Sequence, residues 1–376
     1  MKRILQQAYA VEDEFLTLLS ELVAYESPSS DVNALNRLAD RLEAVLRERG
    51  FATTRHPRQG AGDIIEGRID GGDGPSTLLL CHYDTVWPLG TLAEMPWRRE
   101  GDRVEGPGVL DMKAGIANAI TAVGIARELG LPLVGPVTLL ITSDEEVGSL
   151  HSREIIEERA GQHDRVFVME PGRDDGALKV GRKGVGDFQL HLKGRSAHAG
   201  NNPADGASAL RELAHMLLYV EDQADNVLGT TVNVTTAKAG FASNVIAEEA
   251  RATVDVRVLK ASEAEKVTQA IHDYSPRDSR VQLTVTGGLN RPPMESTPQN
   301  MGLYEQAATL MSEVGLALEG AVVGGGSDGN FTSALGVATL DGLGSVGAGP
   351  HARTEHIRLK ETLERVALVA GMLTRA

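Results

Sequence analysis

Residues 78–86 read Leu78-Leu79-Leu80-Cys81-His82-Tyr83-Asp84-Thr85-Val86, an apolar run that leads directly into a histidine and an aspartate. Short apolar runs of this kind are typical of buried parallel strands. Because side chains alternate along a strand, we expect His82 and Asp84 to share one face. A carboxylate there can hold the proton of one ring nitrogen and leave the other nitrogen to bind a metal ion. Taken alone, this segment is equally typical of a metal ligand and of an inert, hydrogen-bonded histidine.

The overall composition is that of an ordinary globular enzyme. The chain has 376 residues, of which 41% are hydrophobic and 24% charged, and its formal net charge is −15. This length predicts two domains, or one large domain with an insertion. The negative charge argues against nucleic acid and against an anionic membrane as partners. Because Cys81 is the only cysteine, and we identify neither a signal peptide nor a membrane-spanning segment, we expect a cytoplasmic protein.

The pattern of elements changes twice along the chain. Up to about residue 182, short apolar strands alternate with amphipathic helices, which predicts a mostly parallel sheet with helices on both faces. Residues 183–291 instead predict the order β-α-β-β-α-β, the ferredoxin-like split unit. The first pattern then returns. We therefore expect an α/β domain made of residues 1–182 and 292–376, interrupted by an inserted α+β domain at residues 183–291.

Acidic residues and histidines gather where the predicted strands end. Glu145-Glu146 and Glu170 directly follow strands, Asp111 closes a segment rich in glycine and proline at 86–110, and His351 lies near the C-terminus. In open α/β sheets, ligands bind at the carboxyl ends of the strands. Each residue has an inert interpretation, such as a helix N-cap for Asp111 or a solvated turn for Glu170. Their joint placement predicts a metal site.

The pair Glu145-Glu146 is the most specific of these signals. Two adjacent carboxylates at the end of a buried strand repel each other and lose hydration, which proteins tolerate mainly where cations compensate or a raised pKa is useful. We expect one glutamate to bind metal and the other to act as a general base on water. Mixed histidine and carboxylate ligands suit zinc, with cobalt or manganese as alternative ions.

Several segments together resemble the M20 family of co-catalytic zinc peptidases and amidohydrolases, and most of all its glutamate carboxypeptidase (carboxypeptidase G) branch. These segments are residues 82–86, 106–115, 142–149, 169–171 and 349–351. The resemblance covers nearly the whole chain in the same order. It implies a hydrolase that cleaves the amide bond of a small peptide or N-acyl amino acid carrying a free carboxylate. A glutamate carboxypeptidase is the first expectation, and an N-acyl-amino-acid deacylase or dipeptidase of the same family is the alternative.

The resemblance also implies two zinc ions per chain and a ligand set for them. His82 and Glu170 would hold one ion, Glu146 and His351 would hold the other, and Asp111 would bridge the two.

Two further residues receive roles from the same resemblance. Asp84 would orient His82, and Glu145 would be the general base. The family pattern also implies a cis peptide bond after the bridging aspartate, between Asp111 and Met112.

The inserted domain resembles the lid and dimerisation domain of the family, which implies a homodimer. His198 would reach the active site of the second subunit and polarise the scissile carbonyl. Asn244 and Arg291 would bind substrate, and an arginine suits a carboxylate because of its fixed charge and bidentate geometry. Gly326 belongs to a glycine-rich loop implied to line the pocket, and Arg257 is a further substrate-binding candidate that a surface arginine explains about as well.

Two other classes of protein compete with this interpretation. Residues 325–329 fit the G-x-S-x-G nucleophile elbow, and Asp341 and His351 follow Ser327 in the order that serine hydrolases of that fold use. This hypothesis leaves the acidic residues that follow the strands unexplained. A non-catalytic zinc-binding scaffold is the other class, and it predicts the loss of Glu145 or of a ligand, all of which are present.

Overall fold

The computed structural model describes residues 1–375 and divides into two compact units. The larger unit comprises Met1–Gly181, Ser296–Val322 and the residues from Ser327 on, and the smaller unit comprises Arg182–Glu295 and Val323–Gly326. An α/β unit that is interrupted by an α+β unit is the fold class that the sequence predicts. The predicted domain boundaries, with their division into a catalytic domain and a lid or dimerisation domain, stay a prediction.

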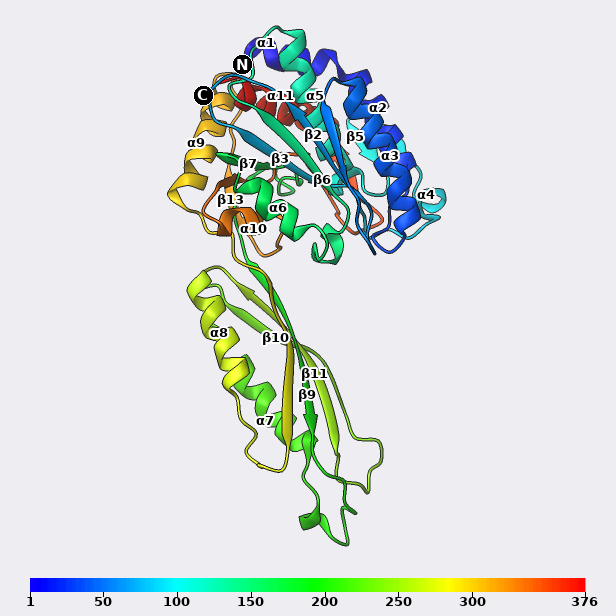
Figure 1. Cartoon of the computed structure of the whole chain (residues 1–376), viewed down its shortest axis with the longest axis vertical. Coiled ribbons are helices and arrows are strands. Elements are labelled where there is room, and N and C mark those ends of the chain that lie inside the picture. The colour runs from blue at the N-terminus through cyan, green and yellow to red at the C-terminus, as the bar shows by residue number, and fades with distance from the viewer. Residues whose placement is uncertain (376) are drawn as a thin grey trace. The chain divides into compact units, whose positions relative to one another are not determined.

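The larger unit is built on a six-stranded sheet with the order β1-β2-β6-β3-β7-β14 (Figure 1). The strands β6, β3, β7 and β14 pair in parallel, whereas β2 pairs antiparallel with both of its neighbours. The central strand β3 is buried at every position, as expected for a strand with helices on both faces. The strand bounds are β1 Ala52–His56, β2 Ile64–Ile69, β3 Thr77–His82, β6 Val137–Thr142, β7 Arg165–Val168 and β14 Ala338–Leu340.

Helices cover both faces of this sheet, and β3 shows why. Leu79 belongs to the main hydrophobic cluster, which also contains the buried faces of α5 and α11. Leu78 and Leu80 point the other way and belong to a second cluster with residues of α6 and α10. The helices of this unit are α1 Lys2–Ala10, α2 Glu12–Ala24, α3 Val32–Glu48, α4 Thr91–Glu94, α5 Ala114–Glu128, α6 Arg153–Ala160, α9 Pro298–Ser312, α10 Gly329–Ala334 and α11 Leu359–Thr374.

Two small sheets add to the main one, and most of their strands lie where the sequence predicts loops, although a strand is expected at 320–323. A four-stranded sheet has the order β15-β16-β5-β4, and β13 pairs with β8. The segment 86–110, expected to be one long loop, thus contains α4, β4 and β5, and neither α1 nor β1 is expected from the sequence. The bounds are β4 Arg98–Glu100, β5 Arg103–Glu105, β8 Leu178–Arg182, β13 Gly320–Val323, β15 Gly347–Ala348 and β16 His356–Arg358.

The smaller unit has the ferredoxin-like order that the sequence predicts. Its four strands pair antiparallel in the order β10-β11-β9-β12, and its two helices pack on the sheet through a separate hydrophobic cluster. The sheet residues in this cluster alternate along β9 and β11, as one buried face requires. The elements are β9 Gly184–Lys193, α7 Ala209–Glu221, β10 Thr231–Ala239, β11 Glu249–Val258, α8 Ala261–Asp273 and β12 Gln282–Arg291.

One helical segment passes the length and composition test for a membrane span. Val109–Glu128 covers 20 residues with a mean hydropathy of 1.3, yet 83% of the window tested is buried inside the protein. Burial between the sheet and α11 therefore accounts for its apolar character. No other helix within residues 1–375 passes the same test.

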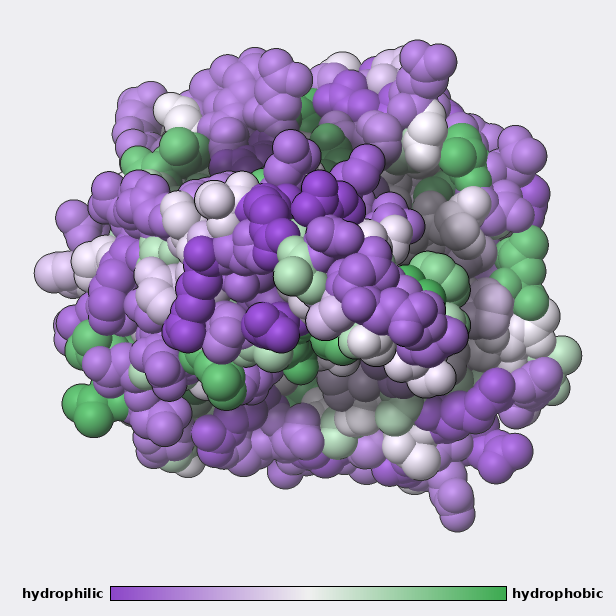
Figure 2. Space-filling model, turned by 90° about the horizontal axis from the view of Figure 1, so that it is seen from below, coloured by the Kyte–Doolittle hydropathy of each residue, from purple (hydrophilic) through white to green (hydrophobic). Residues whose placement is uncertain are grey.

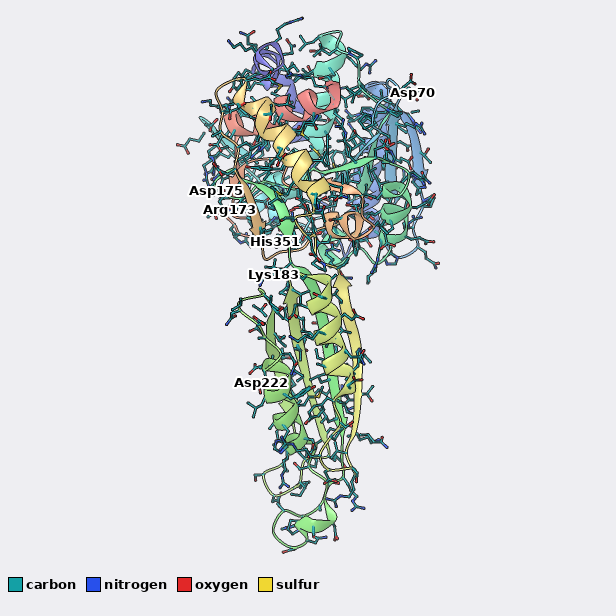
Figure 3. All side chains as sticks on the ribbon, turned by 90° about the vertical axis from the view of Figure 1, so that its left-hand side faces the viewer. Asp70, Arg173, Asp175, Lys183, Asp222 and His351 are labelled. Carbon is teal, nitrogen blue, oxygen red and sulfur yellow. The ribbon has the colours of Figure 1, made fainter. Side chains whose placement is uncertain are left out.

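The surface is largely polar. Figure 2 shows one face on which hydrophilic residues predominate and hydrophobic residues form scattered spots. Exposed charges often pair locally, as Arg173 Nε does with Asp175 Oδ1 at 3.0 Å (Figure 3). Cys81, in contrast, is only 2% exposed, and burial raises the pKa of its thiol.

Candidate metal centre

Three neighbouring parallel strands of the larger unit end in candidate ligands. His82 is the last residue of β3, Glu145 and Glu146 follow β6, and Glu170 follows β7. Because β3 lies between β6 and β7 in the sheet, His82 lies between the glutamate pair and Glu170. Carboxyl ends of parallel strands meet at one edge of a sheet, so the strand order alone brings these side chains together.

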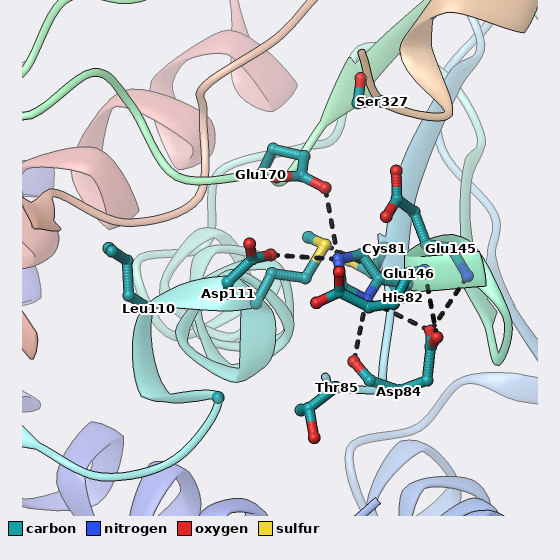
Figure 4. A network of polar contacts seen from close by, with 12 residues as sticks. Cys81, His82, Asp84, Thr85, Leu110, Asp111, Glu145, Glu146, Glu170 and Ser327 are labelled. Carbon is teal, nitrogen blue, oxygen red and sulfur yellow. Dashed lines mark hydrogen bonds and ion pairs between the residues drawn. The ribbon is translucent and has the colours of Figure 1, made fainter. Parts of the chain in front are cut away.

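His82 is held in a fixed orientation by contacts at both ring nitrogens (Figure 4). Its Nδ1 lies 3.1 Å from the backbone carbonyl oxygen of Asp84 and 3.4 Å from Asp84 Oδ1. Its Nε2 lies 3.2 Å from Asp111 Oδ1 and 3.3 Å from Glu170 Oε1. The ring therefore presents Nε2 to the carboxylates, while the Asp84 carbonyl is the nearest partner of Nδ1. The sequence predicts the Asp84 carboxylate as the partner of this nitrogen, whereas the backbone carbonyl of Asp84 lies closer to it.

Asp111 lies between two histidines. Its Oδ1 faces His82, and its Oδ2 lies 3.3 Å from His351 Nε2. The same nitrogen of His351 lies 3.1 Å from Glu146 Oε2. The peptide bond between Asp111 and Met112 is cis, as the family resemblance implies, and His351 has a φ of 60°.

The Asp84 carboxylate holds the backbone of the glutamate pair through hydrogen bonds. Its carboxylate is fully buried and accepts hydrogen bonds from the backbone N–H groups of Glu145, at 3.1 Å, and Glu146, at 3.2 Å. Ser29 Oγ donates a further bond to Asp84 Oδ2 at 2.7 Å. Asp84 therefore joins the end of β3 to the turn after β6, and both glutamates are tied to the segment that carries His82.

The side chains lie close enough to share metal ions. Ligand atoms of His82, Glu145 and Glu170 lie within 4.8 Å of one another, and the same holds for His82, Asp111 and Glu146. Within residues 1–375 these are the two groups of three or more histidine, cysteine or acidic side chains that meet this criterion. Both groups include His82. The first also contains Glu145, which the resemblance implies to be the base and not a ligand, and neither contains His351, which contacts Asp111 and Glu146 instead.

The protonation of this cluster reflects its crowded carboxylates. Burial lowers the pKa of His82, but its contacts with Asp111, Asp84 and Glu170 outweigh burial and raise it well above the ordinary value. Contacts with Asp111 and Glu146 raise the pKa of His351 to about 10. Burial raises the pKa of Glu146 to about 8, against the opposing contact with His351. Burial raises the pKa of Asp111, but the contacts with His351 and His82 outweigh burial and lower this pKa.

The donor set fits divalent metal ions. Imidazole nitrogens and carboxylate oxygens are the ligands that zinc accepts. Glu146 Oε1 is buried, and it has no hydrogen-bond partner among the described residues. A buried carboxylate oxygen without a partner is costly unless a ligand satisfies it, and a metal ion would do so.

The candidate substrate residues lie in the smaller unit. His198 and Asn244 are exposed and occupy adjacent loops, joined by the hydrogen bond from Ala199 N to Asn244 O at 2.9 Å. Arg291 is only 5% exposed, whereas Arg257 is half-buried and pairs with Asp255 at 2.9 Å. That pair favours the surface-arginine interpretation of Arg257.

Gly326 lies beside Arg291 in the same unit. A Cβ atom at residue 326 would come within 2.9 Å of Arg291 Cδ. A glycine at this position therefore leaves room for the arginine side chain.

Comparisons with known proteins lead to one family. A profile of peptidase family M20/M25/M40 matches residues 78–375. The chain is 31% identical over 380 residues to carboxypeptidase G2 from Pseudomonas sp. (strain RS-16), covering 98% of this chain and 91% of the relative. The chain belongs to the M20 family. It is also 30% identical to a succinyl-diaminopimelate desuccinylase from Alkalilimnicola ehrlichii, with 96% and 99% of the two chains covered.

Solved structures show that this M20 chain shares its fold with peptidases. An aminopeptidase PepT from Bacillus cereus matches with a TM-score of 0.82 at 20% identity, covering 96% of this chain and 98% of that chain. An M20 family metallo-carboxypeptidase, Sso-CP2 from Sulfolobus solfataricus, matches with a TM-score of 0.73 at 18% identity over 96% and 98% of the chains. The predicted family, fold class and hydrolase activity are confirmed, and the family is metal-dependent.

The serine-hydrolase hypothesis finds no support in this M20 fold. Ser327 is fully buried, and its Oγ donates a hydrogen bond to Asp341 Oδ2 at 2.6 Å. A serine nucleophile needs a histidine at its hydroxyl and a carboxylate behind that histidine. Here the carboxylate occupies the position next to the hydroxyl, and His351 Nε2 faces Glu146 and Asp111.

Sequence reasoning missed two residues that hold the site of this M20 chain in place. Ser29 contacts Asp84, and Glu355 accepts hydrogen bonds from the backbone next to Asp111. Neither belongs to a recognisable motif, because each contacts its partner across a long separation in the chain. The proximity of Glu355 to His351 in the sequence is the only signal that could have pointed to it.

Proposed function

We propose that this M20 protein is a dinuclear zinc hydrolase that cleaves the amide bond of a peptidyl- or N-acyl-amino acid with a free carboxylate. The observation that carries the proposal is the position of Asp111, whose Oδ1 lies 3.2 Å from His82 Nε2 and whose Oδ2 lies 3.3 Å from His351 Nε2. A carboxylate that presents one oxygen to each of two ligands is suited to bridge two ions. A preference for a C-terminal glutamate rests on the similarity to carboxypeptidase G2.

The ligand assignment follows from the same contacts. His82 and Glu170 would hold one ion, Glu146 and His351 would hold the other, and Asp111 would bridge them. Zinc in such a site supplies Lewis acidity and makes water nucleophilic at neutral pH, and cobalt or manganese can take the same ligands.

Glu145 is the residue that we assign to proton transfer. Its carboxylate lies within 4.8 Å of the ligand atoms of His82 and Glu170, and its backbone N–H is fixed by Asp84. It takes the proton of the attacking water and passes it to the leaving nitrogen, so that the amine departs neutral. The division of labour between the adjacent glutamates is that Glu146 binds metal while Glu145 moves the proton.

Arg291, Asn244 and Gly326 are assigned to the substrate carboxylate. A guanidinium group binds a carboxylate through two parallel hydrogen bonds, and its charge also offsets the repulsion expected from a chain of net charge −15. The small residue at 326 supports this role, because a Cβ there would crowd Arg291. Arg257 stays a weaker candidate, since it already pairs with Asp255.

His198 from a second copy of the chain is assigned to the developing oxyanion. Its Nδ1 accepts hydrogen bonds from the backbone N–H groups of Gly200 and Asn201, both at 3.1 Å. In a neutral imidazole the proton must then be on Nε2, which makes Nε2 a donor. A donor aimed at the oxyanion is the main requirement for transition-state stabilisation in amide hydrolysis. This assignment makes the active form a homodimer, and the single cysteine suits a reducing compartment such as the cytoplasm.

The decisive experiment combines metal analysis with a substrate panel. The purified protein is assayed for zinc per chain, and for hydrolysis of N-acyl glutamate and other N-acyl amino acids before and after chelation. We expect two zinc ions per chain, loss of activity with chelator and recovery with added zinc. A chelator-resistant hydrolase would contradict the proposal.

A deacylase is the second candidate function. The 30% identity to a succinyl-diaminopimelate desuccinylase over 96% of this chain favours it. Varying the acyl group of the same panel, with N-succinyl compounds beside other N-acyl compounds, separates the two. A desuccinylase requires the succinyl group, whereas a glutamate carboxypeptidase requires the C-terminal glutamate and tolerates changes in the acyl group.

A further inference from the structure

Glu355 is a fully buried carboxylate with four N–H donors around it. Its Oε1 accepts hydrogen bonds from the backbone N–H groups of Leu110, at 2.9 Å, and Asp111, at 3.1 Å. Its Oε2 accepts from the backbone N–H of Gly108 at 3.0 Å and from Trp87 Nε1 at 2.7 Å. Each oxygen therefore has two donors, and the carboxylate is satisfied on both sides.

The donors come from different parts of the candidate metal centre. Trp87 follows Asp84 and the end of β3, the backbone donors belong to the turn that carries Asp111, and Glu355 itself follows His351. The bonds to the Asp111 turn span separations of 244 to 247 residues in the chain. One carboxylate thus joins three segments, each of which brings a candidate ligand or its orienting residue.

A buried charge in this position is costly, and the surroundings compensate for it. Charge-assisted hydrogen bonds from N–H groups stabilise a carboxylate more strongly than neutral pairs do. Lys113, also fully buried, donates to the backbone oxygen of Tyr25 at 2.7 Å and lies near enough for its charge to act on Glu355. An apolar residue at position 355 would leave these four buried N–H donors without an acceptor, so the carboxylate is what holds the Asp111 turn to the segment that follows His351.

We propose that Glu355 is the positioning residue for Asp111, fixing the turn so that the two oxygens of Asp111 face His82 and His351. The inference rests on the proposed function, in which Asp111 bridges two ions. Glu355 holds the Asp111 backbone N–H directly, so a shift of this anchor would move the bridging carboxylate relative to both histidines. Residues that hold metal ligands through hydrogen bonds typically change metal affinity by about 10- to 100-fold when they are replaced.

The test is Glu355→Gln, measured by zinc affinity. The amide nitrogen of glutamine is itself a donor, so one pair of buried donors loses its acceptor whichever way the side chain turns. Zinc affinity is measured by competition with a chromophoric chelator, and thermal unfolding of the metal-free protein reports on the fold. We expect zinc affinity to fall by about 10- to 100-fold at a temperature where the metal-free variant is fully folded.

Matched variants make the result specific. Glu364→Gln changes a surface glutamate whose Oε1 accepts from Tyr9 at 2.8 Å, and it should leave zinc affinity unchanged. Trp87→Phe removes only one donor, so it should lower affinity less than Glu355→Gln, and it serves as the test if Glu355→Gln does not fold. Combining Trp87→Phe with Glu355→Gln should cost less than the sum of the two, because one conflicting donor is gone.

The outcomes separate this inference from the proposed function. Wild-type protein that binds no zinc would refute the proposed metal centre. Wild-type protein that binds zinc, together with a folded Glu355→Gln or Trp87→Phe variant of unchanged zinc affinity, would refute the role of Glu355 and leave the metal centre intact.

Discussion

His82 and Asp84 in the larger unit are held more firmly than His198 and Asn244 in the smaller unit. In the larger unit, His82 and Asp84 are buried, and each is fixed by several contacts to other site segments. In the smaller unit, His198 and Asn244 are exposed on loops, and their fixed contacts are with neighbouring loop residues. Buried groups with several fixed contacts keep one geometry, whereas the two exposed loop residues can change position more easily. Among the candidates of the smaller unit, Arg291 is the buried exception.

Replacing Glu145, the proposed general base, should give the largest effect. Glu145→Gln keeps the size of the side chain but cannot accept the proton of water, so kcat should fall by about 10²- to 10⁴-fold. Zinc content, measured on the same sample, should stay at the wild-type value. Glu154→Gln, on the exposed face of α6, is the control and should be fully active. Near-normal turnover in Glu145→Gln would show that Glu145 does not transfer the proton and would contradict its assignment.

Removing His198 should give the next largest effect and should spare the metal. His198→Ala deletes the proposed oxyanion donor, so kcat should fall by about 10²- to 10³-fold while zinc affinity stays constant. His215→Ala on α7 is a matched control within the smaller unit. Mixing His198→Ala with Glu145→Gln should restore part of the activity through hybrid dimers. Absence of any recovery would count against a site shared between subunits.

Replacing the Asp84 carboxylate should lower zinc affinity more than it lowers kcat. Asp84→Asn leaves one acceptor oxygen for the N–H groups of Glu145 and Glu146, so zinc affinity should fall by about 10- to 100-fold. Ser29→Ala removes a single donor to Asp84 and should have a smaller effect in the same direction. Chelator competition measures both, and an Asp84→Asn variant with wild-type affinity would show that the buried contacts are not what holds the metal.

The smallest effect concerns pH. The pKa of His351 is raised to about 10 and that of Glu146 to about 8, so both groups carry protons at pH 7 in the metal-free protein. Metal ligands must be deprotonated, so zinc uptake at pH 7 should release protons, and affinity should rise as pH increases toward these values. Calorimetry in two buffers of different ionisation enthalpy counts the protons. Zinc uptake without proton release would contradict the predicted ligands.

The fold and much of the candidate site could be predicted because the signals are local. Leu78 to Asp84 encode a buried strand and the shared face of His82 and Asp84 in consecutive residues, and the strand ends bring Glu145 and Glu170 to the same edge. The family resemblance, in contrast, is what supplied roles for the residues of the smaller unit, since their loops carry no periodic pattern.

The features that sequence reasoning missed depend on long-range contacts or weak patterns. Glu355 gains its role only through partners more than 240 residues away, which no local pattern encodes. The strand β1 was not predicted because it is partly exposed and polar, and β16 is only 3 residues long. The short strand β16 nevertheless matters, because it directly follows Glu355 and pairs with β5.

The burial of Cys81 has a practical consequence for measuring motion. The raised pKa of this thiol and its exposure of only 2% make it unreactive toward thiol-specific dyes. A cysteine introduced at Asp70 of the larger unit, whose side chain is 96% exposed, and another at the exposed Asp222 of the smaller unit would therefore be the only labelled positions (Figure 3). Energy transfer between two dyes at these positions would follow the separation of the units in solution as zinc and substrate are added.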